Sequence, residues 1–259
     1  VSVSLFKFAI PYSAPLISHL TLLFACFASV VAGREGKHLG LGAALPERGL
    51  VSWLARSLSS FVQLAIIWLL FLSALTMALI SFDYTQRIAF IPLYFFTACI
   101  PIAFLLLAIR ITRPCLSRSP IPSVLGIAAG LWMALPSIVT GLSLFILDMP
   151  DFLWALHDMS LASVSLLRIP LVFILILGAF CGAPLFIVLS GIALVAFASQ
   201  GGPLEAVSYQ TYPMFTGSFV PALPLFTLAG ILLAESRAGF RLVTFVKLAI
   251  GWIRGGPAV

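Results

Sequence analysis

The chain has 259 residues, of which 62% are apolar and 8% are charged, and its formal net charge is +6. Soluble domains carry roughly one quarter charged residues, so this composition and the mean hydropathy of +1.19 exclude an ordinary soluble domain. The basic residues lie between apolar runs that contain the aromatic residues, a pattern that favours contact with membrane lipid and argues against a nucleic-acid partner.

We therefore expect an all-α, polytopic helical membrane protein with about five to six membrane segments and additional amphipathic interfacial helices. Residues 1–15 contain two prolines and are interpreted as a connector. Leu16–Ala32 has about the minimum length of a membrane span. An aqueous loop with Arg34, Lys37 and His38 follows. His38 could handle protons, but a histidine beside basic residues at a helix end is more often an interfacial or capping group.

The next predicted elements are an amphipathic approach and two spans. Pro46–Ser60 carries two arginines and Trp53, which suits a position at the membrane interface. Phe61–Phe82 is the second predicted span, Asp83–Arg87 a turn, and Ile88–Ile109 the returning span. The arginines and prolines that follow predict a linker; they are Arg110, Arg113, Arg118, Pro114, Pro120 and Pro122.

Val124–Leu147 is the fourth predicted span, and an acidic stretch with His157 follows it. A metal site is conceivable there, but the spacing of the carboxylates matches no strong ligand pattern, so an exposed acidic loop is favoured. Arg168–Ala198 is the next predicted span. Small residues along these runs allow either close helix contacts or kinks, and the sequence leaves both open; they are Gly126, Ala129, Gly130, Gly178 and Gly182.

Four cysteines are scattered without a C-x-x-C pair, and we interpret them as small apolar side chains with no disulfide or metal framework; they are Cys26, Cys99, Cys115 and Cys181.

Loop charge predicts an orientation. The loops at 34–56 and 110–118 are rich in arginine, so they are expected in the cytoplasm, opposite the acidic stretch. A single crossing by Arg168–Ala198 then makes Gln200–Gln210 cytoplasmic. A further full crossing by Val220–Ala234 would place the basic residues after it outside, against the rule. Either that segment is broken or re-entrant, or packing fixes the basic helix; both remain open.

The last stretch has a basic stripe with steps of three and four residues, formed by Arg237, Arg241, Thr244, Lys247, Gly251 and Arg254. Such spacing keeps the polar positions on one side of a helix. It fits either a helix at the membrane surface or a transmembrane helix with charged ends.

Two motifs carry a resemblance to a known family. PLFTLAG, with Pro224, Leu225, Phe226, Ala229 and Gly230, is followed by Arg241 and by the pair Gly255 and Gly256. This order resembles the opening of the large membrane subunit of tripartite ATP-independent periplasmic (TRAP) transporters. The helix end with Arg34, Lys37 and His38 resembles the second helix of the small subunit. All eleven positions are expected to be structural.

The resemblance implies a fused small-plus-large subunit, present as a fragment truncated at both ends. Residues 1–119 would be a small-subunit-like scaffold without its first helix, 120–167 the joining helix and acidic loop, and 168–259 the start of the large permease subunit. The family imports small organic anions, carboxylates or acidic sugars, across the bacterial inner membrane with sodium. Its partners are a periplasmic substrate-binding protein and, here, the remainder of the large subunit.

The same resemblance places the substrate and sodium sites beyond Val259, so this fragment is expected to bind no cofactor and to transport nothing alone. An enzyme is disfavoured because His19, His38 and His157 fall in separate segments without a paired nucleophile. The alternative function is a structural or assembly membrane subunit without its own transport site.

Overall fold

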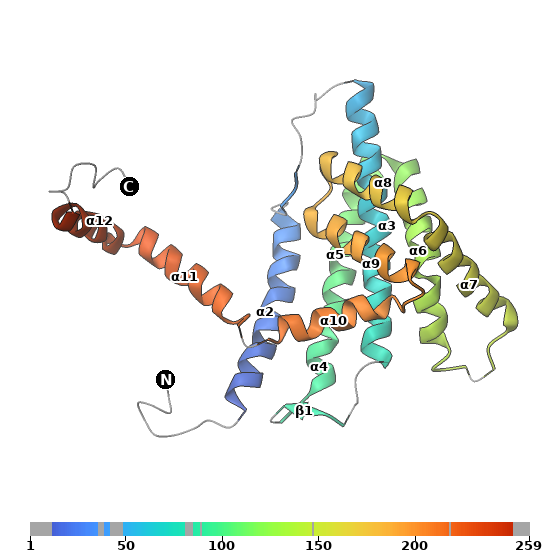
Figure 1. The fold of residues 1–259 in the computed structure, drawn as a ribbon, viewed down its shortest axis with the longest axis horizontal. Helices are drawn as coiled ribbons and strands as arrows, with labels where there is room; N and C mark the ends of the chain where they lie inside the picture. Colours follow the sequence, from blue (N-terminus) through green and yellow to red (C-terminus); the bar gives the residue numbers. More distant parts are fainter. Residues whose placement is uncertain are drawn as a thin grey trace.

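The computed structural model describes residues 12–35, 39–41, 49–80, 85–88, 90–146, 148–217 and 219–250, and these are almost entirely helical (Figure 1). Within them, four helical stretches are long and apolar enough to cross a membrane: α2 (Ser13–Glu35), α3 (Leu50–Ile80), α4 (Leu93–Thr97) joined to α5 (Cys99–Arg118), and α6 (Pro120–Leu142). Two further bent helix pairs raise the number to as many as six. The predicted all-α polytopic class is confirmed.

Helix α3 is the centre of the bundle, and α5, α6, α8, α9 and α10 pack against it. It is one helix of 31 residues, so the predicted division into an approach at Pro46–Ser60 and a span at Phe61–Phe82 is wrong. Neither glycine nor proline occurs between its ends. Ser52 donates to the Gly49 carbonyl and Arg56 to the Ser52 carbonyl, so polar side chains of the first turns bond to the local backbone and the helix continues into its apolar part.

Helices α3 and α6 run in the same direction at very close range. A Cβ atom added to Gly126 would come within 2.6 Å of the Phe61 carbonyl oxygen, and one added to Gly130 would meet the carbonyl oxygen of Ala65. A Cβ atom added to Gly178 of α8 (Arg168–Phe180) would similarly lie 3.0 Å from the Val62 side chain. These three glycines therefore serve close contact, whereas Gly182, at φ +94°, serves a turn.

The predicted linker after Arg110 is much shorter in the structure. Helix α5 continues to Arg118 with Pro114 inside it, and only Ser119, at φ −149°, separates it from α6. Pro120 begins α6, where a missing N–H costs nothing. The returning span also starts later than predicted, at Leu93, because β1 (Arg87–Ile88) and β2 (Ile91–Pro92) form a small antiparallel hairpin first.

The acidic stretch forms helix α7 (Asp151–Leu166), where an exposed loop is the sequence-based expectation. Asp151 lies in its first turn, where a carboxylate stabilises the positive end of the helix dipole. At Leu167 the chain bends by 69° into α8. The predicted single span at Arg168–Ala198 is also wrong, because a turn at Cys181–Pro184 separates α8 from α9 (Leu185–Ser199).

These changes reverse the expected position of Gln200–Gln210. The start of α9 lies beside the end of α2, since the Leu185 N–H donates to the Leu39 carbonyl at 2.8 Å. Helix α10 (Glu205–Phe215) begins near the far end of α3, where Ser73 Oγ donates to the Leu204 carbonyl at 2.9 Å. The chain between α9 and α10 thus lies at the end of the bundle opposite the first turns of α3, on the side where α7 begins (Figure 1).

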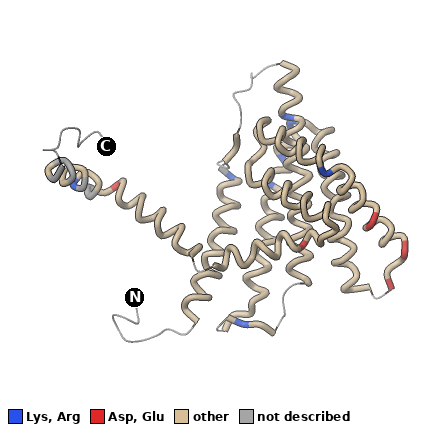
Figure 2. Tube along the Cα trace, viewed as in Figure 1, with Lys and Arg blue, Asp and Glu red and all other residues tan. Residues whose placement is uncertain are grey.

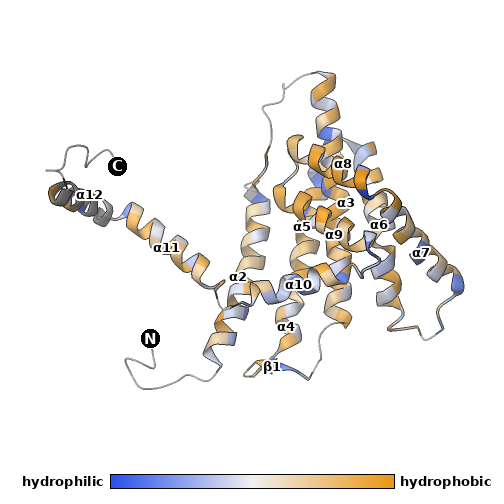
Figure 3. Cartoon of the chain, viewed as in Figure 1, coloured by the Kyte–Doolittle hydropathy of each residue, from blue (hydrophilic) through white to orange (hydrophobic). Residues whose placement is uncertain are grey.

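Helices α11 (Ala222–Glu235) and α12 (Arg237–Ile250) form an arm that projects from the bundle and bends by 73° between the two helices (Figure 1). Helix α11 leaves from the level of α10 and rises toward the level of the arginine-bearing end of α2 (Figures 1 and 2). This course removes the conflict with the loop-charge rule, because α11 begins at the acidic end of the bundle. Figure 3 shows that α11 is apolar along most of its length.

Candidate functional site

The described motif residues of the predicted large-subunit opening lie on the arm. Every residue of α11 is described and none is buried; Leu225 and Phe226 are 65% and 76% exposed. Arg241 and Thr244 in α12 are exposed as well. Gly251, Arg254, Gly255 and Gly256 lie outside the described residues. The motif therefore forms a free apolar surface followed by a polar bend.

The second motif is described only in part. Arg34 is exposed in the last turn of α2, whereas Lys37 and His38 lie outside the described residues. Among the described motif residues, Arg34 lies in α2 of the bundle and the others lie in α11 of the arm, so these residues do not form one site (Figure 1); the α11 residues are Pro224, Leu225, Phe226, Ala229 and Gly230.

A buried polar seam joins α10 to the centre of the bundle. Ser73 Oγ lies 3.0 Å from Ser208 Oγ in addition to its bond to Leu204, and Ser73 is fully buried. Thr76 Oγ1 donates to the Ser137 carbonyl at 3.0 Å, and Ser137 Oγ donates to the half-buried Glu205 carboxylate at 3.4 Å. Sequence analysis missed this seam, because single serines within apolar runs carry no signal of their own.

His19 and Tyr212 form a second polar contact near the opposite end from Arg56. His19 is buried, its Nε2 lies 2.6 Å from the Tyr212 hydroxyl, and its Nδ1 lies 2.7 Å from the Pro15 carbonyl oxygen. Burial raises the pKa of Tyr212 to about 12, so the hydroxyl stays protonated and donates. A neutral ring with its proton on Nδ1 then satisfies both contacts.

The His19 contact borders a cavity of about 450 Å³ lined by Gln86, Arg87, Leu93, Tyr209, Tyr212 and Thr216. Phe96 meets the His19 ring edge-on with the ring centroids 5.1 Å apart. The contact joins α2 to α10 across 193 positions of sequence. Its geometry can hold these two helices together and can respond to loss of the phenolic proton.

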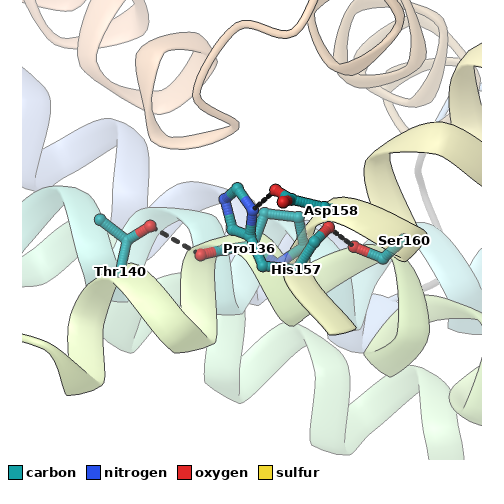
Figure 4. A network of polar contacts seen from close by, with 5 residues as sticks. All are labelled: Pro136, Thr140, His157, Asp158 and Ser160. Carbon is teal, nitrogen blue, oxygen red and sulfur yellow. Dashed lines mark hydrogen bonds and ion pairs between the residues drawn. The ribbon is translucent and has the colours of Figure 1, made fainter. Parts of the chain in front are cut away.

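The acidic helix α7 carries a third polar contact, which is exposed. His157 Nδ1 lies 2.9 Å from Asp158 Oδ1 on an exposed face, and Ser160 Oγ donates to the His157 carbonyl (Figure 4). The neighbouring Thr140 donates to the Pro136 carbonyl within α6. In the part of the chain that the structure describes, no three His, Cys, Asp or Glu side chains come together to hold a metal ion.

The four cysteines are all free. Cys115 is buried, and the other three are half-buried within or beside the helices. They pack as small side chains, with Cys115 in the contact between α3 and α5.

Comparisons with protein-family models, with curated proteins and with solved structures find no match to this chain.

Proposed function

We propose that the chain is the scaffold and the opening of the permease in a sodium-coupled, binding-protein-dependent importer of small organic anions. The bundle α2–α10 is the scaffold, and the arm α11–α12 leads into the part of the permease that carries substrate and sodium. A periplasmic binding protein delivers the anion, and the membrane is the bacterial inner membrane. This proposal depends on the motifs of the arm and of the α2 end.

The observation that supports it best is the contrast between the bundle and the arm. The bundle encloses a core that includes Leu69, Ile187 and Leu194, each fully buried. Helix α11 has the same apolar character but buries no side chain. An apolar helix that ends in a sharp bend and a basic helix is suited to join a second membrane body to this scaffold.

The second candidate function is a structural or assembly membrane subunit without a transport site. It is favoured by the distribution of charge in the described bundle. Helices α6 and α9 contain no charged residue, and the arginines of α5 lie in its last turns. Among the acidic residues whose burial is described, only Glu205 is half-buried, and the Ser137 hydroxyl already donates to it. Ion coordination needs more oxygen ligands than this.

Deleting the coding segment for residues 1–259 from its host and measuring uptake of labelled dicarboxylates and acidic sugars into membrane vesicles separates the two functions. The transporter proposal predicts that sodium-driven uptake of at least one anion disappears and returns on complementation. Uptake that survives the deletion, together with loss of a membrane complex, would leave only the assembly function.

The isolated chain provides the matched control. Residues 1–259 reconstituted in liposomes are expected to show no sodium-dependent uptake, because no described group of residues forms a carboxylate or sodium site. Measurable uptake by the isolated chain would contradict this division of labour between the scaffold and the rest of the permease.

A further inference from the structure

A cavity of about 390 Å³ lies where the end of α2, the first half of α3, the end of α5 and the turn between α8 and α9 meet. Its polar lining comes from two helix faces. Arg56, Ser59, Ser60 and Gln63 follow one side of α3, and Arg110 and Arg118 lie two turns apart on α5. The backbone of Gly33, Gly40 and Gly182 closes the remaining sides.

The charge of this lining is one-sided. Three arginines line the cavity, and no described acidic side chain does. Arg56 donates through Nε and Nη2 to Ser52, and its other N–H groups have no partner among the described residues. Among the described residues, Arg110 and Arg118 have neither a hydrogen-bond partner nor an ion-pair partner. The three guanidinium groups line one cavity without a described carboxylate beside them, so an anion bound between them would be stabilising.

The chemistry of the donors indicates which anion fits. Guanidinium groups present planar pairs of N–H donors that match phosphate oxygens, and the Ser59 hydroxyl, which accepts from Gln63, adds a neutral donor. The same cavity has an apolar portion formed by Ile111, Pro114 and Cys115. The site lies at the arginine-rich end of the bundle, and basic clusters at the ends of membrane helices attract anionic lipid headgroups.

We propose that this cavity binds a phosphate group through Arg56, Arg110 and Arg118, as the headgroup of an anionic phospholipid or as a free phosphate. The apolar portion of the lining suits the first carbons of a lipid acyl chain. A lipid bound here would contact α2, α3, α5 and the α8–α9 turn together. The site is independent of the proposed transport function.

The test is lipid retention by the full chain after reconstitution in nanodiscs of phosphatidylglycerol and phosphatidylcholine, measured by native mass spectrometry. The wild-type chain should retain phosphatidylglycerol. Each arginine changed to glutamine should weaken retention about fivefold, and the triple variant roughly 100-fold, because a basic residue near the surface contributes about 1 kcal/mol toward anionic lipid. The double variant Arg110→Lys with Arg118→Lys should bind more weakly than the wild type but more tightly than the matching double glutamine variant, because the charge remains while the planar donor pairs are lost.

Arg113→Gln is the matched control, since Arg113 is exposed on the same helix and does not line the cavity. A parallel titration with inorganic phosphate in detergent distinguishes the source of the ligand. Phosphate binding that needs the three arginines, without retention of phosphatidylglycerol, would assign the site to a free phosphate. Equal retention by the triple variant and by Arg113→Gln, with no arginine-dependent phosphate binding, would overturn the proposal.

Discussion

The α3–α6 pair and helix α11 of the arm are made of similar apolar sequence but differ completely in packing. Gly130 lies against the backbone of Ala65, whereas a Cβ atom at Gly230 would meet nothing within 4 Å. Both glycines lie inside apolar helices, so hydropathy does not distinguish them. A glycine in an apolar helix therefore allows a close helix contact only where the backbone of a second helix lies against it. Within the described residues, Gly230 of α11 has no such partner.

The largest difference between the two regions is expected when one methyl group is added at each glycine. Gly130→Ala should lower the free energy of unfolding of the bundle by about 3 kcal/mol, because the new Cβ meets a backbone carbonyl that has no rotamer to move away. Gly230→Ala should change it by less than about 0.5 kcal/mol. Tryptophan fluorescence during unfolding in detergent reports both values, since Trp68 and Trp132 hydrogen-bond within the bundle.

Equal stability of the Gly130→Ala and Gly230→Ala proteins would show that α3 and α6 can separate without cost. The role assigned to Gly130 would then be wrong.

A smaller effect is expected where the bundle meets the start of the arm, at His19 and Tyr212. Tyr212→Phe leaves the buried His19 Nε2 without its donor, so stability should fall by about 1–3 kcal/mol. In a double-mutant cycle with His19→Leu, the coupling should be about 1 kcal/mol. Additive losses in that cycle would show that the 2.6 Å contact contributes nothing.

The same contact predicts a dependence on pH. The pKa of Tyr212 is raised to about 12 in the folded chain, above the value near 10 of an unfolded tyrosine. The stability that it contributes is therefore fully present below about pH 10 and is lost as the pH rises through about 12. The unfolding midpoint of the wild-type chain should therefore fall across this pH range, and the part of the fall that comes from Tyr212 should be absent in Tyr212→Phe.

The smallest effect on the bundle is expected from the arm itself. Phe226→Ser should leave the unfolding of the bundle unchanged within about 0.5 kcal/mol, because Phe226 is exposed on α11. It should instead weaken co-purification with the rest of the permease, which the proposed function places against this surface. Phe27→Ser, at a similarly exposed position of α2, is the control. Identical co-purification of both variants would remove the arm from the interface.

Much of the helical fold could be predicted from the sequence, but the helix ends were less predictable. Continuous apolar runs identified α2, α5 and α6, while Arg56 and the serines before Phe61 hid the true start of α3. Charge led us to expect a loop where Asp151 begins α7, although an acidic first turn also favours a helix start. Missing α7 also reversed the expected position of Gln200–Gln210, because each helix that crosses the bundle changes the end at which the following segment lies.

The polar contacts were beyond sequence analysis for a different reason. Ser73 and Leu204 are separated by 131 positions, and His19 and Tyr212 by 193. Nothing in local spacing relates them. The sequence shows the glycines but not their roles. Whether Gly126 or Gly182 allows a close helix contact or forms a turn depends on the residue that it faces and on its φ angle, which only the structure provides.

The central position of α3 also has a consequence for biosynthesis. A ribosome completes α3 well before α6, and the ends of the two helices are separated by about 60 residues, or roughly 3–12 s of synthesis. During this interval the groove that later receives Gly126 and Gly130 faces the insertion machinery or lipid, together with the buried Ser73 and Thr76. Slowing translation between the two helices should therefore expose the nascent chain to membrane proteases and lower its yield.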